Sequence, residues 1–270
     1  PDGSSLQRAG STIIGSIYGR APAFDVDSTG ALSNPATLWS SWPLSEIMPA
    51  AGAPECFYND ILRRLSCRIV GTPGFSFGGG PSTQERSVPV FSGVGFYLEN
   101  GAAAGADFLS GSTPWTVAGW IRVTTAPAEG GVGHIIGRQS TADGRGWALR
   151  ITTSGGVMFA STFIGTGGAG NQAFTGGTAI SLATWTHVAA AWDGATLYNW
   201  VNGVASSAAS TTTIGAPDAT TFFSIGNDAS LANNFLGRIC LQTLWVNTAL
   251  ATARVLELYN AGVPNRLRAA

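Results

Sequence analysis

The stretch WTHVAAAWDGATLYNWVNGV, residues 185–204, contains two apolar runs separated by Asp193-Gly194. An Asp-Gly pair readily takes the positive φ angles of a two-residue hairpin turn, so we expect the runs to pair as antiparallel strands. Side chains alternate between the two faces of a strand. One face is accordingly apolar and should be buried, and it carries Val188, Ala190, Trp192, Leu197 and Val201.

Asn199 interrupts this apolar face, because alternation calls for an apolar residue at its position. A buried amide is costly unless it is hydrogen-bonded. The sequence leaves two interpretations open. Either the face is partly wet, or a backbone group satisfies the amide.

The hairpin resembles the W-x-H-V-A-x-x-x-D-G-x-x-L-x-x-x-V-x-G signature of laminin-G-like jelly rolls, in the concanavalin A-like superfamily. Further segments resemble motifs of the same family, in the same order: PWTVAGWIRV (114–123), GWALRITTSGGVMFA (146–160), FFSIGND with FLGRI (222–239), and VNTALATARVLELYNAG (246–262). The resemblance covers about residues 89–262. It implies an all-β fold, an antiparallel two-sheet jelly-roll sandwich.

The first 88 residues lie outside this resemblance and are predicted to form an N-terminal arm. Residues 1–54 are rich in Gly and Pro, which excludes long regular elements, and their short apolar pieces should lie on the sandwich or on a partner chain. Apolar residues recur every four positions after Pro54, which predicts a helix near 55–69 that packs on the sandwich or docks into an assembly partner. The Gly-rich stretch 71–86 predicts a hinge, with the domain boundary near Val88 and a tail at 263–270.

Composition excludes several partners. Charged residues make up 11% of the chain and the net charge is −1, so no long-range field favours nucleic acid. No run of about 20 apolar residues predicts a membrane span. The segment PDGSSLQRAG (1–10) lacks the apolar core of a secretion signal. Cys56, Cys67 and Cys240 are an odd number, and we expect thiols rather than a disulfide framework.

A glycosidase would need two neighbouring carboxyl groups, which a strand supplies at i, i+2 or i+4. No two acids of the predicted sandwich have that spacing: Glu99, Asp107, Glu129, Asp143, Asp193, Asp218, Asp228 and Glu257. Asp193 is assigned to a turn and Glu257 to a terminal helix. As for imidazole bases, His187 is interpreted as a structural strand residue and His134 as a solvated loop residue. We therefore expect no catalytic residues and no enzyme activity.

Calcium is the metal that the family resemblance suggests, since many laminin-G-like domains hold one Ca²⁺ near the rim. The resemblance places acids at four positions that here hold Ser92, Gly95, Cys240 and Leu241. Calcium requires several oxygen ligands, usually including carboxylates. We expect neither a metal nor a cofactor at this site. A different site built on Asp228, Asn227 and loop carbonyls is the remaining alternative.

The chain has 9 tryptophans, and these are its candidate sugar contacts. Alternation predicts four that point inward: Trp115, Trp120, Trp185 and Trp192. Trp147 and Trp200 are predicted on the opposite side, where they serve either as cross-strand packing partners or as exposed aromatic faces. The sequence alone names no sugar site.

These observations favour a non-catalytic binding or structural module. The first hypothesis is a bacteriophage virion protein, such as a capsid decoration, cement or fibre-like component, assembled in the host cytoplasm. Its N-terminal arm would contact other virion proteins, the chain would form a homo-oligomer, and a host-surface glycan is a candidate ligand. The alternative is an extracellular bacterial carbohydrate-binding or adhesion module. A glycoside hydrolase ranks last.

Overall fold

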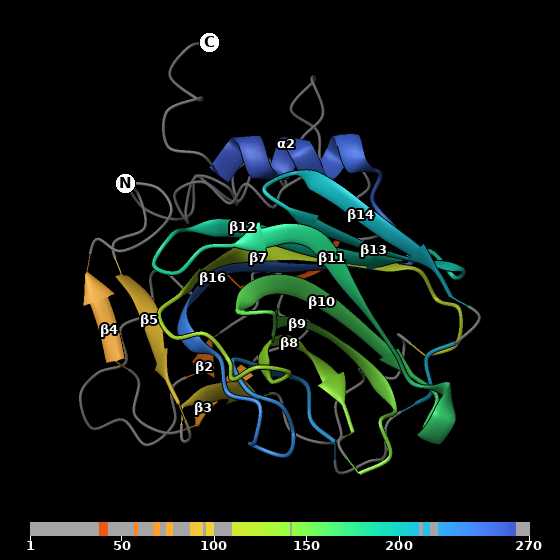
Figure 1. Cartoon of the computed structure of the whole chain (residues 1–270), viewed down its shortest axis with the longest axis horizontal. Coiled ribbons are helices and arrows are strands. Elements are labelled where there is room, and N and C mark those ends of the chain that lie inside the picture. The colour runs from red at the N-terminus through yellow and green to blue at the C-terminus, as the bar shows by residue number, and fades with distance from the viewer. Residues whose placement is uncertain are drawn as a thin grey trace, which may run out of the picture.

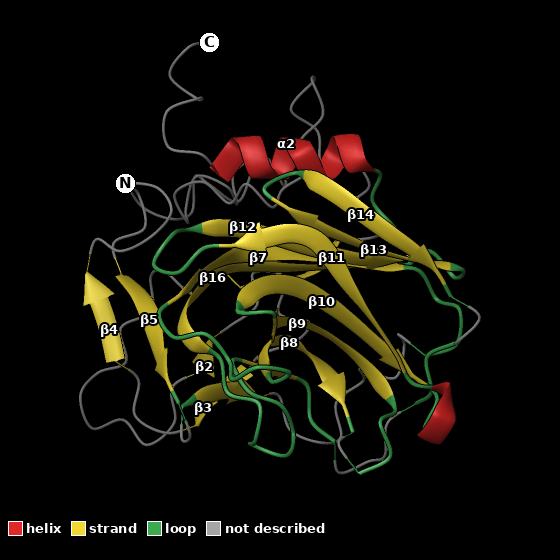
Figure 2. Ribbon diagram, viewed as in Figure 1, coloured by secondary structure: helices red, strands yellow, loops and turns green. Residues whose placement is uncertain are grey.

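The computed structural model consists of two antiparallel sheets stacked face to face (Figures 1 and 2). It confirms the predicted all-β jelly-roll sandwich. It describes residues 38–42, 57–58, 67–70, 74–77, 87–93, 96–99, 110–140, 142–210, 213–216 and 221–262.

The first sheet has the strand order β14-β13-β12-β7-β16-β5-β4, and β1 also pairs with β16. The bounds are β1 Leu38–Trp42, β4 Gly74–Phe77, β5 Ser87–Ser92, β7 Trp115–Val123, β12 Thr186–Trp192, β13 Thr196–Val201, β14 Val204–Ala209 and β16 Leu236–Val246. β16 pairs along one edge with β7 and along the other with β5 and then β1. It is therefore the strand that joins β7 on one side of this sheet to β5 and β1 on the other.

The second sheet has the order β11-β10-β9-β8-β15-β6-β3-β2. The bounds are β2 Phe57–Tyr58, β3 Cys67–Val70, β6 Tyr97–Glu99, β8 Val132–Gln139, β9 Gly146–Ser154, β10 Val157–Gly165, β11 Gln172–Ile180 and β15 Ser224–Ile225. A short 3₁₀ turn, η3 (Gly168–Gly170), connects β10 to β11.

The core between the sheets follows the alternation read from the sequence. Val188, Ala190 and Trp192 of β12 are fully buried in it, together with Leu197 and Val201 of β13. The register pairs Val188 with Val201 and Trp192 with Leu197, so both strands turn the same face inward. The predicted buried face of the hairpin is confirmed.

The hairpin turn lies one residue later than predicted. Asp193 and Thr196 flank it, and Gly194, with φ 101°, and Ala195 are its central residues. Asp193 does not take a positive φ; instead its carboxylate accepts the N–H groups of Ala195 (2.8 Å) and Thr196 (2.7 Å). The aspartate thus stabilises the turn through its side chain.

Helix α2 (Thr252–Gly262) lies across the outer face of the first sheet (Figure 1). Val255 and Leu258 pack there on Ala189, Trp200 and Trp245, and Trp200 Nε1 donates to Thr252 Oγ1 at 3.3 Å. The helical part of the C-terminal motif is confirmed. Within the described residues, no helix is long and apolar enough to cross a membrane.

The prediction of one helix near 55–69 is wrong at both of its ends. Phe57–Tyr58 and Cys67–Val70 are strands, and they pair antiparallel, with Phe57 opposite Arg68 and Tyr58 opposite Cys67. The chain must therefore fold back between them, which a continuous helix cannot do. Edge pairing has outweighed the four-residue apolar spacing. Residues 59–66 lie outside the described part.

Strands also occur where the sequence predicted an arm and a hinge. β1 pairs with β16, β3 with β6, and β4, which lies in the Gly-rich stretch, with β5. Each adds backbone hydrogen bonds to a strand edge, which explains why these short segments join the sheets. The boundary near Val88 consequently does not separate an arm from the sandwich. Residues 1–37, most of residues 43–66, and the tail at 263–270 lie outside the described residues.

Candidate functional site

The outer face of the second sheet is formed by β8, β9 and β10. Trp147, Leu149 and Ile151 of β9 point into the core, so Arg150 between them points outward. Arg150 lies opposite His134 of β8 on one side and Ser161 of β10 on the other. Charged, imidazole and hydroxyl groups therefore form one row across three strands.

Arg150 is held by an aromatic ring. Its guanidinium carbon lies 4.7 Å from the centroid of the Phe163 ring, which is itself outward on β10. Within the described residues the guanidinium makes no hydrogen bond or ion pair, and its Nε is buried without a partner. Burial lowers the pKa of Arg150 to about 10, and the charge of Asp228 acts in the opposite direction. The group is therefore cationic at neutral pH.

His134 is not the solvated loop residue that the sequence predicted. It lies on β8 and is 1% exposed. Its Nε2 faces the carbonyl oxygen (3.4 Å) and the hydroxyl (3.3 Å) of Ser224, and its Nδ1 has no partner. Burial lowers the pKa of His134 to about 4, so the ring is neutral at pH 7. The prediction failed because the preceding Gly-rich loop ends at Gly131, before His134, and β8 begins at Val132.

Asp228 organises its own loop. Its carboxylate accepts the Ser230 hydroxyl (2.8 Å), the Ala232 N–H (3.3 Å) and the side-chain amide of Asn233. Burial alone would raise the pKa of Asp228, but these donors and the nearby His134 hold it below its usual value. Asn227 is also engaged, because its Oδ1 accepts the N–H of Asp228 at 2.9 Å and its Nδ2 donates to Asn234 Oδ1 at 2.7 Å. The oxygens considered for an alternative cation site thus already receive protein N–H and O–H groups.

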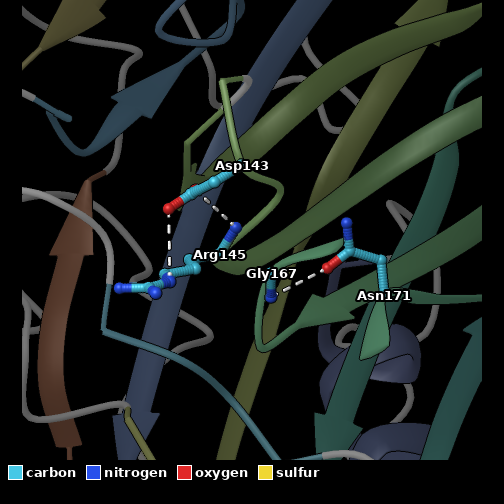
Figure 3. A network of polar contacts seen from close by, with 4 residues as sticks. All are labelled: Asp143, Arg145, Gly167 and Asn171. Carbon is cyan, nitrogen blue, oxygen red and sulfur yellow. Dashed lines mark hydrogen bonds and ion pairs between the residues drawn. The ribbon is translucent and has the colours of Figure 1, made fainter. Parts of the chain in front are cut away.

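A second polar surface lies on the rim, where the β8–β9 loop meets the β10–β11 loop (Figure 3). Arg145 Nε lies 3.2 Å from Asp143 Oδ2, and Asn171 Oδ1 accepts the N–H of Gly167 at 3.1 Å. A Cβ on Gly144 would collide with the Asn171 amide. The N–H of Gly168 also donates to the carbonyl of Asp143 at 3.0 Å, and this hydrogen bond links the two loops.

The other acids and the second histidine also have structural partners. Glu129 accepts the N–H groups of Gly155 and Gly156, and Glu257 pairs with Arg254 on α2. His187 is 2% exposed and packs against both Trp120 and Tyr259, as the structural interpretation predicts. Asp107 and Asp218 lie outside the described residues.

At the positions where the family resemblance places calcium ligands, the described side chains are either apolar or stand alone. Cys240 is fully buried against Val88 and Trp120. Ser92 is exposed and lies opposite Leu236. Gly95 and the side chain of Leu241 are outside the described part. The absence of a metal here stays a prediction.

The predictions for tryptophan are partly wrong. Trp115 and Trp192 point into the core as predicted, but so does Trp147, which lies 4.8 Å from Trp115 between ring centroids. Trp120 is five positions from Trp115, an odd separation, and so faces outward, where Trp185 packs beside it. Trp200 is also outward but is covered by α2. Neither Trp147 nor Trp200 is an exposed aromatic face.

A shallow hollow of about 230 Å³ lies where β11 approaches β13 and β14. Its lining is largely apolar and comprises Gln172, Ala173, Phe174, Leu197, Ala208 and Ala209. No charged residue lines this hollow, so it has fewer groups that could bind a polar ligand than the row that contains Arg150.

The stacked antiparallel sheets, with one outer face covered by a helix, define a jelly-roll domain of the lectin type. The chain belongs to the concanavalin A-like lectin/glucanases superfamily, whose laminin G model matches residues 99–255. This confirms the resemblance drawn from the hairpin motifs. No curated protein matches the sequence.

Solved structures share the fold at low identity. Domain 4 of an extracellular arabinanase from Geobacillus stearothermophilus, in complex with arabinotriose, is 14% identical with a TM-score of 0.57, covering 83% of this chain and 98% of that one. The binding domain of Paraclostridial Mosquitocidal Protein 1 is 14% identical, with a TM-score of 0.59 and coverage of 83% and 52%. The binding domain of botulinum neurotoxin DC, in complex with SialylT, is 12% identical, with a TM-score of 0.56 and coverage of 85% and 52%.

The sequence analysis missed the pair formed by Arg150 and Phe163. A signal for the arginine was present, because a charged residue flanked by inward Leu149 and Ile151 must lie on the outer face. The contact of the Phe163 ring with Arg150 could not be predicted in the same way, because it depends on the register between β9 and β10.

Proposed function

We propose that this protein is a non-catalytic carbohydrate-binding module. The observation that carries the proposal is the outer face of the second sheet, where the partly exposed Arg150 and Phe159 and the exposed Thr175 combine a cation, an aromatic ring and a hydroxyl. Protein sites for sugars use aromatic faces together with a few placed polar groups. The first sheet offers no equivalent where α2 covers its outer face, over β12, β13 and β16.

Two further observations support this function over hydrolysis. The carboxylates of Asp193, Asp228 and Glu129 are each engaged in holding a turn or loop, as described above. A retaining or inverting hydrolase needs a carboxylic acid and a carboxylate that face the substrate. Among the structural relatives, the arabinanase domain was solved with arabinotriose and the neurotoxin binding domain with SialylT, and we extend glycan binding from them to this chain.

A glycan array tests the proposal. Labelled protein should bind a restricted set of glycans, and heat-denatured protein should bind none of them. The glycans bound are then incubated with the protein and analysed for new reducing ends, which should not appear. Binding to no glycan would contradict the proposal, and release of reducing ends would contradict its non-catalytic part.

We further propose a virion as the setting for this module, with docking through the N-terminal residues and a homo-oligomeric assembly. The supporting observation is the apolar stretch STIIGSIYG (11–19), which combines low charge with too few residues to form a core of its own. Mass spectrometry of purified phage particles should detect the chain at stoichiometric levels. Its detection only in the extracellular fraction of a bacterium would favour the alternative, a bacterial adhesion module.

A further inference from the structure

Arg150 differs from four other arginines of the described chain, because its guanidinium has neither a hydrogen bond nor an ion pair there. Arg122 Nε donates to the Ala183 carbonyl at 2.8 Å, and Arg138 Nε donates to the Thr221 carbonyl at 2.9 Å. Arg145 and Arg254 pair with carboxylates. Arg150 makes neither kind of contact, although its Nε is removed from water. A desolvated cation without an acceptor is costly unless something binds to it.

The nearby acid does not supply that acceptor. Asp228 lies close enough to influence Arg150 electrostatically, but its oxygens receive Ser230, Ala232 and Asn233. Movement of the carboxylate toward Arg150 would break the hydrogen bonds that organise the loop. The N–H groups of the guanidinium are therefore not taken up by Asp228.

The Phe163 ring fixes the orientation of the guanidinium. The guanidinium carbon lies over the ring at 4.7 Å, which favours a stacked arrangement, and Arg150 is partly exposed, so the edge of the fork can meet a ligand. That edge matches the two oxygens of a planar carboxylate. The geometry consequently selects a carboxylate more than a single hydroxyl.

The surroundings suit a sugar. Phe159, two residues before Ser161, lies on the same outward face and is partly exposed, so it offers an apolar surface to ring C–H groups. Thr175 of β11 lies opposite Ser161 and is exposed, which provides a hydroxyl one strand further on. A ligand of monosaccharide size can thus meet a cation, an aromatic ring and a hydroxyl together.

We infer that the outer face of the second sheet binds a carboxylate-bearing sugar residue, such as a sialic or uronic acid, with its carboxylate on Arg150 and its ring over Phe159. This inference rests on the proposed carbohydrate-binding function and names the ligand class. The bidentate contact sets the preference for acidic glycans, and Phe163 holds the guanidinium in place for it.

The test compares glycans that differ only in the acid group. Calorimetric titrations use oligosaccharides ending in N-acetylneuraminic acid or glucuronic acid, the same compounds with the carboxyl group reduced, and a sulfated oligosaccharide. The wild-type protein should bind the carboxylated forms at least about tenfold more tightly than the reduced forms, as expected for a charge-assisted hydrogen-bond pair. R150Q should abolish that difference, and R150K should retain only part of it because lysine lacks the fork.

R145Q is the matched control, because Arg145 is an exposed arginine on the rim that already pairs with Asp143. It should leave the preference unchanged. The Arg150 Nε–H resonance of the wild-type protein, followed by ¹⁵N-NMR during titration with N-acetylneuraminic acid, should shift, and this readout does not depend on the variants folding.

The outcomes separate the two proposals. Glycan binding without preference for the carboxylated form, or with the preference intact in R150Q, would overturn the inference and leave the proposed function standing. A preference for the sulfated oligosaccharide would overturn the assignment of a planar carboxylate. Failure to bind any of these compounds or any array glycan would overturn both.

Discussion

The side-chain amide of Asn199, on the first sheet, donates to the backbone carbonyl of Phe174, on the second, at 2.8 Å. It also donates to the Ala160 carbonyl at 3.3 Å and accepts the Thr162 hydroxyl. This settles the two interpretations that the sequence left open, because the residue is 1% exposed and its amide meets backbone groups. The face is dry, and Asn199 links the sheets.

Replacing Asn199 with alanine should destabilise the protein by about 2 kcal/mol or more, because the substitution leaves buried carbonyl groups without a donor. Urea denaturation followed by tryptophan fluorescence measures the loss. Ser207→Ala, at an exposed position on neighbouring β14, is the control and should change the free energy of unfolding by less than about 0.5 kcal/mol. Equal effects of the two changes would show that the link between the sheets contributes nothing.

Leu258 and Leu256 offer a matched pair on α2, since the same truncation is made at 8% and 41% exposure. Leu258→Ala should cost about 2 to 3 kcal/mol because it leaves a cavity above the first sheet. Leu256→Ala should cost much less. The buried change should also expose Trp200 and shift its fluorescence to longer wavelength. The interpretation of α2 as a packed cover would be wrong if Leu256→Ala had the larger effect.

Gly226 has a φ of 89°, and a Cβ at this position would collide with the Phe91 ring. Gly111 has a φ of 70° with nothing close to the added atom. Gly111→Ala should cost about 1 kcal/mol from backbone strain alone. Gly226→Ala adds overpacking and should cost about 2 to 4 kcal/mol. Thermal unfolding of both variants measures the difference, and similar melting temperatures would contradict the clash.

The 2 histidines should make stability fall as the pH is lowered. Burial lowers the pKa of His134 to about 4 and that of His187 to about 3, from an ordinary value of 6.5. Below pH 6.5 the unfolded chain binds protons that the folded chain does not, so the free energy of unfolding decreases until the folded pKa is reached. Each histidine should contribute about 1 kcal/mol between pH 6 and pH 5.

His187→Phe removes one of these groups and keeps a ring against Trp120 and Tyr259. The change in unfolding free energy between pH 6 and pH 5 should then be about half that of the wild type. Denaturation curves at several pH values measure it. An undiminished slope would mean that His187 is protonated in the folded protein.

Local patterns predicted the hairpin well. The alternation of Val188, Ala190 and Trp192 is independent of the rest of the chain, and the core is on the side that it indicated. Tryptophans were harder to place, because burial depends on what covers each face. Trp200 is buried by α2, a segment 50 residues further along the chain, which no strand pattern reveals.

The N-terminal strands β1 to β4 were not predicted, for a similar reason. β2 and β3 are too short for alternation to be visible; β2 pairs with β3, and β3 joins the sheet through its hydrogen bonds to β6. The four-residue spacing of Phe57, Ile61 and Leu65 therefore suggested a helix. The site on Arg150 required the register of three strands, and that register is a property of the assembled sheet.

The pairing of β1 with β16 joins residues near opposite ends of the sequence, with Leu38 opposite Trp245 and Trp42 opposite Gln242. β16 also separates β7 from β5, so the first sheet lacks its central strand until residue 246 has been synthesised. Contacts this distant in sequence slow folding, because a long loop must close before any of them forms. On the ribosome, β5 and the paired strands β7, β12, β13 and β14 cannot be joined until β16 has been synthesised, and exposure to aggregation is greatest during that interval.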